Sequence, residues 1–300
     1  MSMRVVFAGS PEVAVPYLRA LHDSAITVAA VISREDSPVG RKRVVTATAV
    51  AQEAARLDLT TIKANSPRDI QIPDVDLGIV VAYGGMIPDR LLTLPTHGWI
   101  NVHFSVLPAY RGAAPLQRAL WDGRESTGIS IFRLVAELDA GPVFVSRVIA
   151  FEADETASDA LTRIANDTTA DLVAVVHQIL AGTLSPHPQV GDVSFAPRFE
   201  RADGRINWSE SSAVIHHKIR AVTREPGAFT TVADVPFGVL RVRAGDGSIL
   251  PPGHVNVTAS GVFVGTGDST LELIDVQPPG KPAMAAADWG RGLRTLIVFA

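Results

Sequence analysis

Asn101, His103 and Asp139 are the residues of this 300-residue chain whose types and spacing could do chemistry. Asn101 and His103 lie two positions apart where a short apolar run ends, so both side chains can leave the same side of a strand. An amide that donates to a developing oxyanion and an imidazole that takes a proton are groups that acyl transfer requires. Asp139 follows between two predicted strands and supplies a carboxylate. The three residues predict a site for acyl transfer.

Each of these motifs also has a plainer explanation. An isolated Asn-x-His is more often a turn residue beside a satisfied core histidine, and Asp139-Ala-Gly can be an ordinary turn. The stretch that follows His103 favours the functional interpretation. It carries the backbone-shaping residues Pro108 and Gly112 in a span that is too polar for a core.

The elements that must position these residues begin as a βαβ unit. Strands are predicted at 4–8, 26–32, 76–82 and 99–102, and Ser10 is predicted to cap a helix that has Pro11 at its first position. Continuous apolar runs such as 76–82 are typical of central parallel strands. Ligands bind outside the carboxyl ends of such strands, which is where Asn101 and His103 fall.

The remaining pattern predicts two domains joined by a linker. Helices are expected at 46–57, 115–121 and, as one long helix, 156–180; strands at 127–134 and 143–151; and a loop at 33–45. Beyond residue 182 we expect a Pro- and Gly-rich linker, a helix at 213–223 and short strands at 229–232, 239–242, 253–257, 262–266 and 271–276.

These patterns predict an α/β fold. Its sheet is open, mostly parallel and Rossmann-like, with helices on both faces. A smaller β-barrel-like (OB-like) domain follows. The predicted boundaries are 1–184 for the catalytic domain, 185–204 for the linker and 205–300 for the C-terminal domain.

Composition narrows the class of protein. Hydrophobic residues make up 47% of the chain and its formal charge is −4, which suits a globular protein. No apolar run approaches the roughly 18 residues of a membrane span, so we expect a cytoplasmic protein. The absence of cysteine excludes disulfides, thiolate metal sites and cysteine nucleophiles. The histidines, including His216 and His217, lack metal-ligand spacing, so no metal is expected.

Several short motifs, each present once, are distributed along almost the whole chain. They are Phe7-Ala-Gly-Ser-Pro11, Val81-Ala-Tyr-Gly84, Asn101-Val-His103, Ser105-Val-Leu-Pro108, Arg111-Gly-Ala-Ala-Pro115, Leu138-Asp139-Ala-Gly141, Ile206-Asn-Trp208 and Gln277-Pro-Pro-Gly-Lys281-Pro-Ala-Met284. This set resembles the methionyl-tRNA formyltransferase family. All folate-dependent formyltransferases share the Asn/His/Asp set, so it specifies the chemistry and not the acceptor. The stretch 277–284 is more specific to the tRNA enzymes.

The resemblance implies the substrates. The donor would be 10-formyltetrahydrofolate, and the acceptor would be the α-amino group of methionine on initiator tRNA. Part of the folate pocket would be formed by Ser105, Val106, Leu107 and Pro108. The enzyme is expected to act as a monomer, without metal or membrane.

The catalytic roles can be argued from the side chains. The amine must be neutral to attack the formyl carbon, and the negative charge then develops on oxygen. Our hypothesis is that Asn101 and His103, as donors, stabilise that oxygen. Asp139 would orient His103, tune its protonation and help to carry the amine's proton to the leaving nitrogen. The attack is expected to be direct, because no serine lies in a nucleophile elbow.

The tRNA contacts implied by the resemblance are Arg41, Lys42 and Arg43 in the basic loop, with Lys281 as a second candidate. A charge run is more often a solvated loop. The loop also departs from the family pattern, since Ser37 stands where an arginine is common and a following Pro-Ser-Pro is missing.

Other functions remain open from the sequence. The acceptor could be an amino-sugar nucleotide or glycinamide ribonucleotide, although the latter enzymes lack a C-terminal domain. A folate-binding hydrolase would release formate instead. A dinucleotide-binding oxidoreductase is disfavoured, because the turn after the first strand holds one glycine where that fingerprint needs three. An RNA-binding module without catalysis would not need the Asn/His/Asp set.

Overall fold

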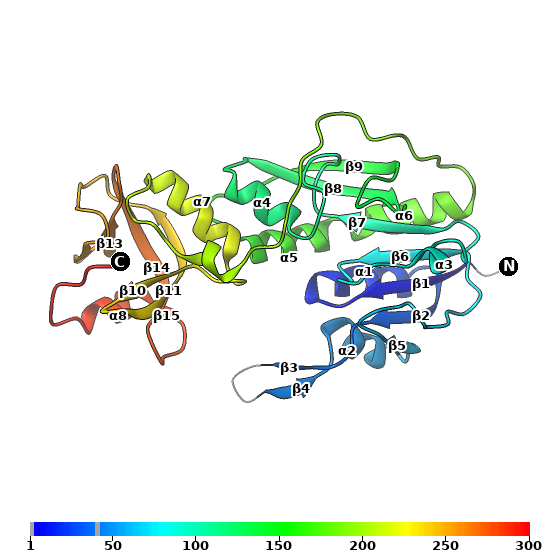
Figure 1. The fold of residues 1–300 in the computed structure, drawn as a ribbon, viewed down its shortest axis with the longest axis horizontal. Helices are drawn as coiled ribbons and strands as arrows, with labels where there is room; N and C mark the ends of the chain where they lie inside the picture. Colours follow the sequence, from blue (N-terminus) through cyan, green and yellow to red (C-terminus); the bar gives the residue numbers. More distant parts are fainter. Residues whose placement is uncertain (1–2, 40–42) are drawn as a thin grey trace. The chain divides into compact units, whose positions relative to one another are not determined.

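The computed structural model describes residues 3–39 and 43–300, and the chain forms two compact units (Figure 1). The first unit comprises Met1–Pro115, Thr127–Ile149 and Leu161–Ala196. The second comprises Leu116–Ser126, Ala150–Ala160 and Pro197–Ala300. The predicted domain boundaries stay predictions, since a compact unit is defined by packing and not by independent folding.

The first unit is built on a seven-stranded sheet in the order β5-β2-β1-β6-β7-β8-β9. The pairs from β5 to β7 are parallel, and β8 runs antiparallel to β7. The strands are β1 (Arg4–Gly9), β2 (Thr27–Ser33), β5 (Thr61–Lys63), β6 (Leu77–Val81), β7 (Trp99–His103), β8 (Ser126–Arg133) and β9 (Val143–Ala150). The predicted open, mostly parallel sheet is confirmed.

Both faces of the central strands are buried. Val5 and Phe7 point to one face of β1 and Val6 and Ala8 to the other, and all four are 0% exposed. The cluster on the second face gathers Val6 and Ala8 with Trp99, whose indole N–H donates to the Leu91 carbonyl of α3. A sheet covered on both faces holds its strands rigidly, so the carboxyl end of β7 is a fixed platform.

The helices of this part of the chain match the predicted ones, except that α3 was not predicted and two predictions need correction. They are η1 (Glu12–Ala14), α1 (Val15–His22), α2 (Ala49–Arg56), α3 (Asp89–Leu92), α4 (Pro115–Trp121), α5 (Ala157–Asp167) and α6 (Thr169–Leu180). The prediction that Ser10 caps a helix is wrong, because its hydroxyl donates to the Tyr83 carbonyl. The single helix predicted over 156–180 is also wrong. It breaks at Thr168, whose hydroxyl bonds to the Ile164 carbonyl and the Tyr17 hydroxyl.

The stretch predicted as a loop after β2 contains a two-stranded antiparallel ribbon. Its strands are β3 (Ser37–Val39) and β4 (Val44–Thr46). Thr48 follows the ribbon, and its side chain accepts from the Ala51 N–H and caps α2.

The second unit is built on an antiparallel sheet in the order β10-β11-β14-β13-β12, with β15 paired to β14. This half-barrel confirms the predicted β-rich C-terminal part. Its elements are η2 (Arg201–Gly204), α7 (Ser212–Val222), β10 (Phe229–Val232), β11 (Val235–Ala244), β12 (Val255–Val257), β13 (Val262–Gly265), β14 (Thr270–Gln277), β15 (Met284–Ala285) and α8 (Ala286–Arg291). Helix α8 lies outside the sequence prediction.

Aromatic rings form the core of this half-barrel. Phe299 stacks on Trp208 at 5.5 Å between ring centroids and on Trp289 at 6.0 Å, and Phe237 packs against both Trp289 and Phe299. The Trp208 indole N–H donates to the Thr230 hydroxyl. The Ile206-Asn-Trp208 motif is therefore explained by packing.

In the described part of the chain, no helix is both long and apolar enough to cross a membrane. The same residues contain no group of three or more metal-ligating side chains placed to share an ion.

Candidate active site

Asn101 and His103 project from the carboxyl end of β7. The register pairs Asn101 with Val80 of β6 and with Phe132 of β8, so the strand is fixed on both sides. The side-chain oxygen of Asn101 is buried and has no hydrogen-bond partner. Buried polar atoms are nearly always paired in folded proteins, and an exception calls for a ligand or a mechanism. Asn101 therefore offers an amide oxygen that no donor of the described residues satisfies.

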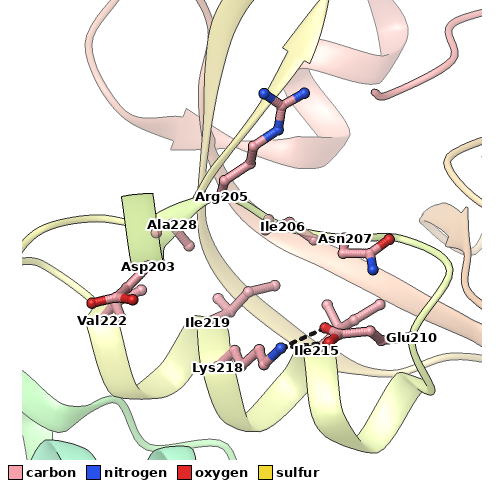
Figure 2. A pocket seen from close by; sticks show the side chains of 11 residues that line it. Asp203, Arg205, Ile206, Asn207, Glu210, Ile215, Lys218, Ile219, Val222 and Ala228 are labelled. Carbon is pink, nitrogen blue, oxygen red and sulfur yellow. Dashed lines mark hydrogen bonds and ion pairs between the residues drawn. The ribbon is translucent and has the colours of Figure 1, made fainter. Parts of the chain in front are cut away.

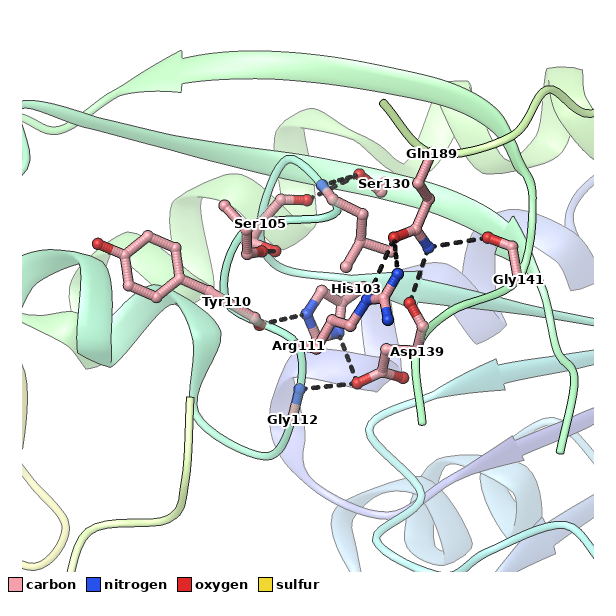
Figure 3. Close-up of polar contacts among 11 residues, drawn as sticks. His103, Ser105, Tyr110, Arg111, Gly112, Ser130, Asp139, Gly141 and Gln189 are labelled. Atoms are coloured by element: carbon pink, nitrogen blue, oxygen red, sulfur yellow. Dashed lines mark hydrogen bonds and ion pairs between the residues drawn. The ribbon is translucent and has the colours of Figure 1, made fainter. Parts of the chain in front are cut away.

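The His103 ring is oriented by a backbone carbonyl. It is 5% exposed, and its Nε2 lies 2.8 Å from the carbonyl oxygen of Tyr110 (Figure 3). A carbonyl only accepts, so Nε2 carries the proton in this bond. The other ring nitrogen, Nδ1, faces Asp139 Oδ2 at 3.7 Å, which is longer than a hydrogen bond. In the neutral ring, Nδ1 is the nitrogen with the lone pair.

The surroundings of His103 favour the neutral ring. Burial lowers its pKa, and this effect exceeds the opposing influence of the Asp139 charge and of the Tyr110 carbonyl, both of which raise it. The pKa of His103 therefore lies below the ordinary value of 6.5. At neutral pH the ring is a base with a carboxylate close by, ready to stabilise the charge if it takes a proton.

Asp139 reaches the site from the turn between β8 and β9. Its Oδ2 accepts the Gly112 backbone N–H at 2.8 Å, and its side chain is 11% exposed. Its φ of 46° lies in the left-handed region, which is costly for a residue with a Cβ. Gly141 completes the turn, where any Cβ would lie 1.7 Å from the Arg133 carbonyl oxygen. The structure thus brings Asp139 to His103 as the sequence predicts.

The four residues predicted to line the folate pocket form a fixed turn after β7. Ser105, Leu107 and Pro108 are buried, while Val106 is half-buried. The Ser130 hydroxyl of β8 donates to the Ser105 carbonyl at 2.8 Å and accepts from the Leu107 N–H at 3.0 Å. The Ser105 hydroxyl donates to the Ala109 carbonyl. The two serine hydroxyls therefore hold the turn in place, and of its four side chains only that of Val106 is half-buried.

Four residues with a part in this geometry lie outside the sequence prediction of the site. They are Tyr110, Gly112, Ser130 and Gln189. Gly112 lies within the recognised motif, and its φ of 123° and its approach to Ala196 require glycine. Gln189 lies in the stretch assigned to the linker, and nothing in its local sequence marks it. Only its contacts identify it.

The predicted tRNA contacts belong to two compact units and fall partly outside the described residues. Arg41 and Lys42 lie outside the described residues. Arg43 is exposed immediately before β4 with a φ of 49°. Lys281 is exposed in the turn after β14, in the second unit, where its backbone N–H donates to the Pro278 carbonyl. Both described cations are available to a polyanion, and neither lies in the Asn101–His103–Asp139 cluster.

Two hollows are lined by other residues of the described chain. One is a small hollow in the second unit between residues 203–210 and α7, beside which Lys218 pairs with Glu210 at 2.6 Å (Figure 2). The other is an open hollow of about 570 Å³ in the first unit, a size that suits small molecules. Its lining includes Asn65, Arg68, Met86 and Arg90. None of the three candidate catalytic residues lines either hollow.

Comparisons with known proteins agree with this geometry. The family model described as formyl transferase matches residues 3–176, and that for the formyl transferase C-terminal domain matches residues 198–294. A methionyl-tRNA formyltransferase from Clavibacter michiganensis subsp. michiganensis is 45% identical, over 99% of this chain and 100% of that protein. One from a Nocardioides species is 44% identical, over 97% of this chain and 96% of that protein.

Solved structures share the fold at low sequence identity. HypX from Aquifex aeolicus in complex with tetrahydrofolic acid is 16% identical with a TM-score of 0.68, over 96% of this chain and 47% of that chain. The sugar 3N-formyl transferase WlaRD, solved with dTDP and 5-N-formyl-THF, is 15% identical with a TM-score of 0.65, over 94% of this chain and 100% of that chain. At this identity they show the fold alone. The family models and the full-length relatives go further: this chain belongs to the formyltransferase family and, within it, to the methionyl-tRNA formyltransferases.

Proposed function

We propose that this protein transfers the formyl group of 10-formyltetrahydrofolate to the α-amino group of methionyl initiator tRNA. Relatives named methionyl-tRNA formyltransferase cover the chain from end to end at 42–45% identity, which supports the acceptor. The folate derivatives named in the structures of HypX and WlaRD support the donor class. The formylated product serves translation initiation.

The observation that carries the proposal is the unpartnered side-chain oxygen of Asn101, on the strand that also holds His103. The amide can present its oxygen or its N–H groups to a ligand. An amine N–H supplies the donor that the Asn101 oxygen lacks, and the Asn101 N–H groups can donate to a formyl oxygen. The residues present therefore fit a formyl donor and an amine acceptor.

Each of the three side chains has a distinct role in the proposed mechanism. His103 Nδ1 accepts a proton from the attacking amine, because Nε2–H is held by the Tyr110 carbonyl. The Asn101 N–H groups stabilise the negative charge that develops on the formyl oxygen. The Asp139 carboxylate, 3.7 Å from Nδ1, stabilises the imidazolium, and the protonated Nδ1 can then also donate to that oxygen.

The proton that His103 Nδ1 takes from the amine leaves from the same nitrogen. The bond from the amine nitrogen to the formyl carbon forms, and the bond from that carbon to the donor nitrogen breaks. His103 passes the proton it took to the leaving nitrogen, so the ring returns to its neutral form. The turn 105–108 is proposed to hold the folate beside β7, through its backbone and Val106.

The RNA contacts are proposed for Arg41, Lys42 and Arg43 in the basic loop and for Lys281 in the C-terminal part. Arg43 and Lys281 are exposed, and Arg41 and Lys42 adjoin Arg43 in the sequence. Since the net charge is −4, binding of a polyanion depends on such local groups.

A formylation assay with competing acceptors tests the proposal. Purified enzyme and 10-formyltetrahydrofolate are offered methionyl initiator tRNA, an amino-sugar nucleotide or glycinamide ribonucleotide, and formyl transfer is measured for each. We expect formylation of the charged tRNA alone, with none when its α-amine is blocked by acetylation. Free formate without any acceptor is measured in parallel.

Two outcomes contradict the proposal. Formylation of the amino-sugar nucleotide alone would assign a different acceptor to the same chemistry. Formate release at the same rate with and without acceptor would identify a hydrolase.

A further inference from the structure

The Gln189 side chain joins both ends of the turn that carries Asp139. Its amide nitrogen donates to the Asp139 carbonyl and to the Gly141 carbonyl, each at 2.8 Å (Figure 3). An amide nitrogen has two N–H groups, so both donors are used on this one turn. Gln189 is half-buried, while Pro188 and Val190 on either side of it are exposed.

The other end of the same amide is tied to the segment that orients His103. Gln189 Oε1 accepts from Arg111 Nη2 at 2.7 Å and from Nε at 3.2 Å. The Arg111 side chain is 10% exposed, and its backbone N–H and carbonyl bond to Ser194 and Ala196. Arg111 stands between Tyr110, which holds His103, and Gly112, which holds Asp139. Gln189 therefore links the turn that carries Asp139 to the segment 110–112, which bonds to both His103 and Asp139.

The turn needs such a support. Asp139 is a non-glycine residue with a φ of 46°, in the left-handed region that residues with a Cβ seldom adopt. Its carboxylate must face His103 Nδ1 to act on it, and it does so at 3.7 Å. All the hydrogen-bonding groups of the Gln189 amide are occupied by the protein, which leaves this side chain a supporting role.

We infer that Gln189 is a positioning residue of the transfer reaction, whose amide holds the Asp139 turn so that the carboxylate faces His103. The inference rests on the proposed function for the identity of the reaction. Gln189 touches none of the reacting groups and acts through Asp139.

Two substitutions distinguish the role of the Gln189 amide nitrogen from that of its oxygen. Gln189→Met keeps the length of the side chain and removes every hydrogen bond. Gln189→Glu keeps an acceptor for Arg111 and turns a second oxygen toward the Asp139 and Gly141 carbonyls. We expect both to lower kcat about 10- to 100-fold, with KM for methionyl-tRNA and for the folate within about 2-fold. The matched control is Asn166→Leu, which removes an exposed amide-to-carbonyl bond to Thr162 of α5 and should leave kcat unchanged.

A second measurement needs no activity. The imidazoles of the substrate-free enzyme are titrated by NMR, with His103 assigned among the eight histidines by a His103→Asn spectrum. Since the Asp139 charge raises the pKa of His103, displacement of the carboxylate in Gln189→Met should move the His103 midpoint to lower pH. The other midpoints should stay in place. A purely structural defect would not select this ring.

The outcomes test the positioning role of Gln189 separately from the proposed function of the enzyme. An unchanged His103 midpoint together with wild-type kcat in Gln189→Met overturns the inference. Wild-type kcat in Gln189→Glu alone also overturns it, because the role would then run through Arg111 and not through the turn. If the wild-type enzyme formylates no amine, the proposed function fails, and the His103 midpoint still decides whether Gln189 positions Asp139. If Gln189→Met does not fold, the split between kcat and KM in Gln189→Glu decides.

Discussion

His103 works in this site because its two ring nitrogens have different partners. Nε2–H is committed to the Tyr110 carbonyl, which fixes the tautomer and the plane of the ring. Nδ1 faces a carboxylate at a distance that allows stabilisation of a charge without a hydrogen bond in the resting state. Asn101 contributes an amide with spare hydrogen-bonding capacity on the same side of β7. The chemistry therefore depends on three side chains with separable roles.

Removal of any of the three should abolish most of the turnover. For Asn101→Ala, His103→Ala and Asp139→Ala we expect kcat to fall by about 10²- to 10⁴-fold, the range that a positioned proton acceptor or oxyanion donor contributes. Steady-state kinetics with methionyl-tRNA measures the loss, and circular dichroism confirms the fold. Near-wild-type kcat in any one variant would remove that residue from the mechanism.

The pH dependence of the reaction reports the protonation state of His103. A neutral Nδ1 is the active form, so kcat/KM should rise with pH through the pKa of His103, which burial holds below 6.5. In Asp139→Asn the charge that raises this pKa is absent, and the rising limb should move to lower pH while the maximum falls. The profile is measured for both enzymes with the same substrate, so titration of the amine cancels. A wild-type rate that falls as pH rises through this range would instead mean that the protonated ring is the active form.

At the scale of elements, an ion-pair cluster joins α1 to α2 beside the sheet. Glu53 of α2 is 6% exposed and accepts from Arg19 and from Arg56, with the shortest bonds at 2.6 and 2.7 Å. Hydrogen bonds from Arg19 and then from Arg56 lower the pKa of Glu53 from 4.5 to about 2. A buried carboxylate held by two guanidinium groups fixes the two helices against each other.

This cluster should make stability depend on pH in a defined window. Because the pKa of Glu53 is lower in the folded state, the unfolded chain binds more protons between pH 4.5 and about 2. The stabilisation is complete above pH 4.5 and is lost as pH falls toward 2. Glu53→Gln should lower the free energy of unfolding by about 1 to 3 kcal/mol at pH 7. That difference should fade in the acidic window.

Urea unfolding of both proteins across this pH range measures the effect. The control is Asp36→Asn, which breaks the more exposed pair with Lys63 and should cost less than about 1 kcal/mol. A Glu53→Gln difference that stays constant between pH 7 and pH 3 would contradict the assignment.

At the scale of the molecule, the acceptor is a polyanion many times larger than the catalytic cluster. Arg43 and Lys281 belong to different compact units, and both are exposed. Binding through phosphate contacts releases counterions, so each contact adds to the salt dependence of binding.

Substitution of these cations should therefore affect binding and not chemistry. Arg43→Ala and Lys281→Ala should each raise KM for methionyl-tRNA several-fold, leave kcat unchanged and reduce the slope of log KM against log salt by about 1. Initial rates at several salt concentrations measure this. Lys63→Ala is the control, because its ammonium is already paired with Asp36 at 2.7 Å. A KM for tRNA that stays at the wild-type value would exclude the residue from the RNA contact.

The local sequence predicts most of the helices and strands, because the apolar patterns that indicate them involve only neighbouring residues. The apolar run at 76–82 became β6, and Pro115 through Trp121 formed α4 as predicted. The predictions were wrong where a residue far away in the sequence forms a hydrogen bond with the element. Ser10 bonds to Tyr83 instead of capping a helix, and Thr168, held by Tyr17, divides the predicted helix in two. Such long-range contacts leave no periodic trace in the chain.

The sequence by itself determined the α/β class, the residue types of the site and, through its motifs, the family. Strand periodicity and the Asn101-x-His103 spacing are properties of a few neighbouring residues, so they survive without a structure. Only the tertiary structure decided that the Tyr110 carbonyl fixes the His103 ring, and that Asp139 approaches Nδ1 from 36 positions along the chain. It also brought Gln189, from the stretch predicted as the linker, to the same turn. The reason is physical: a hydrogen bond depends on where the folded backbone puts its two atoms, and folding brings together atoms that the sequence keeps far apart.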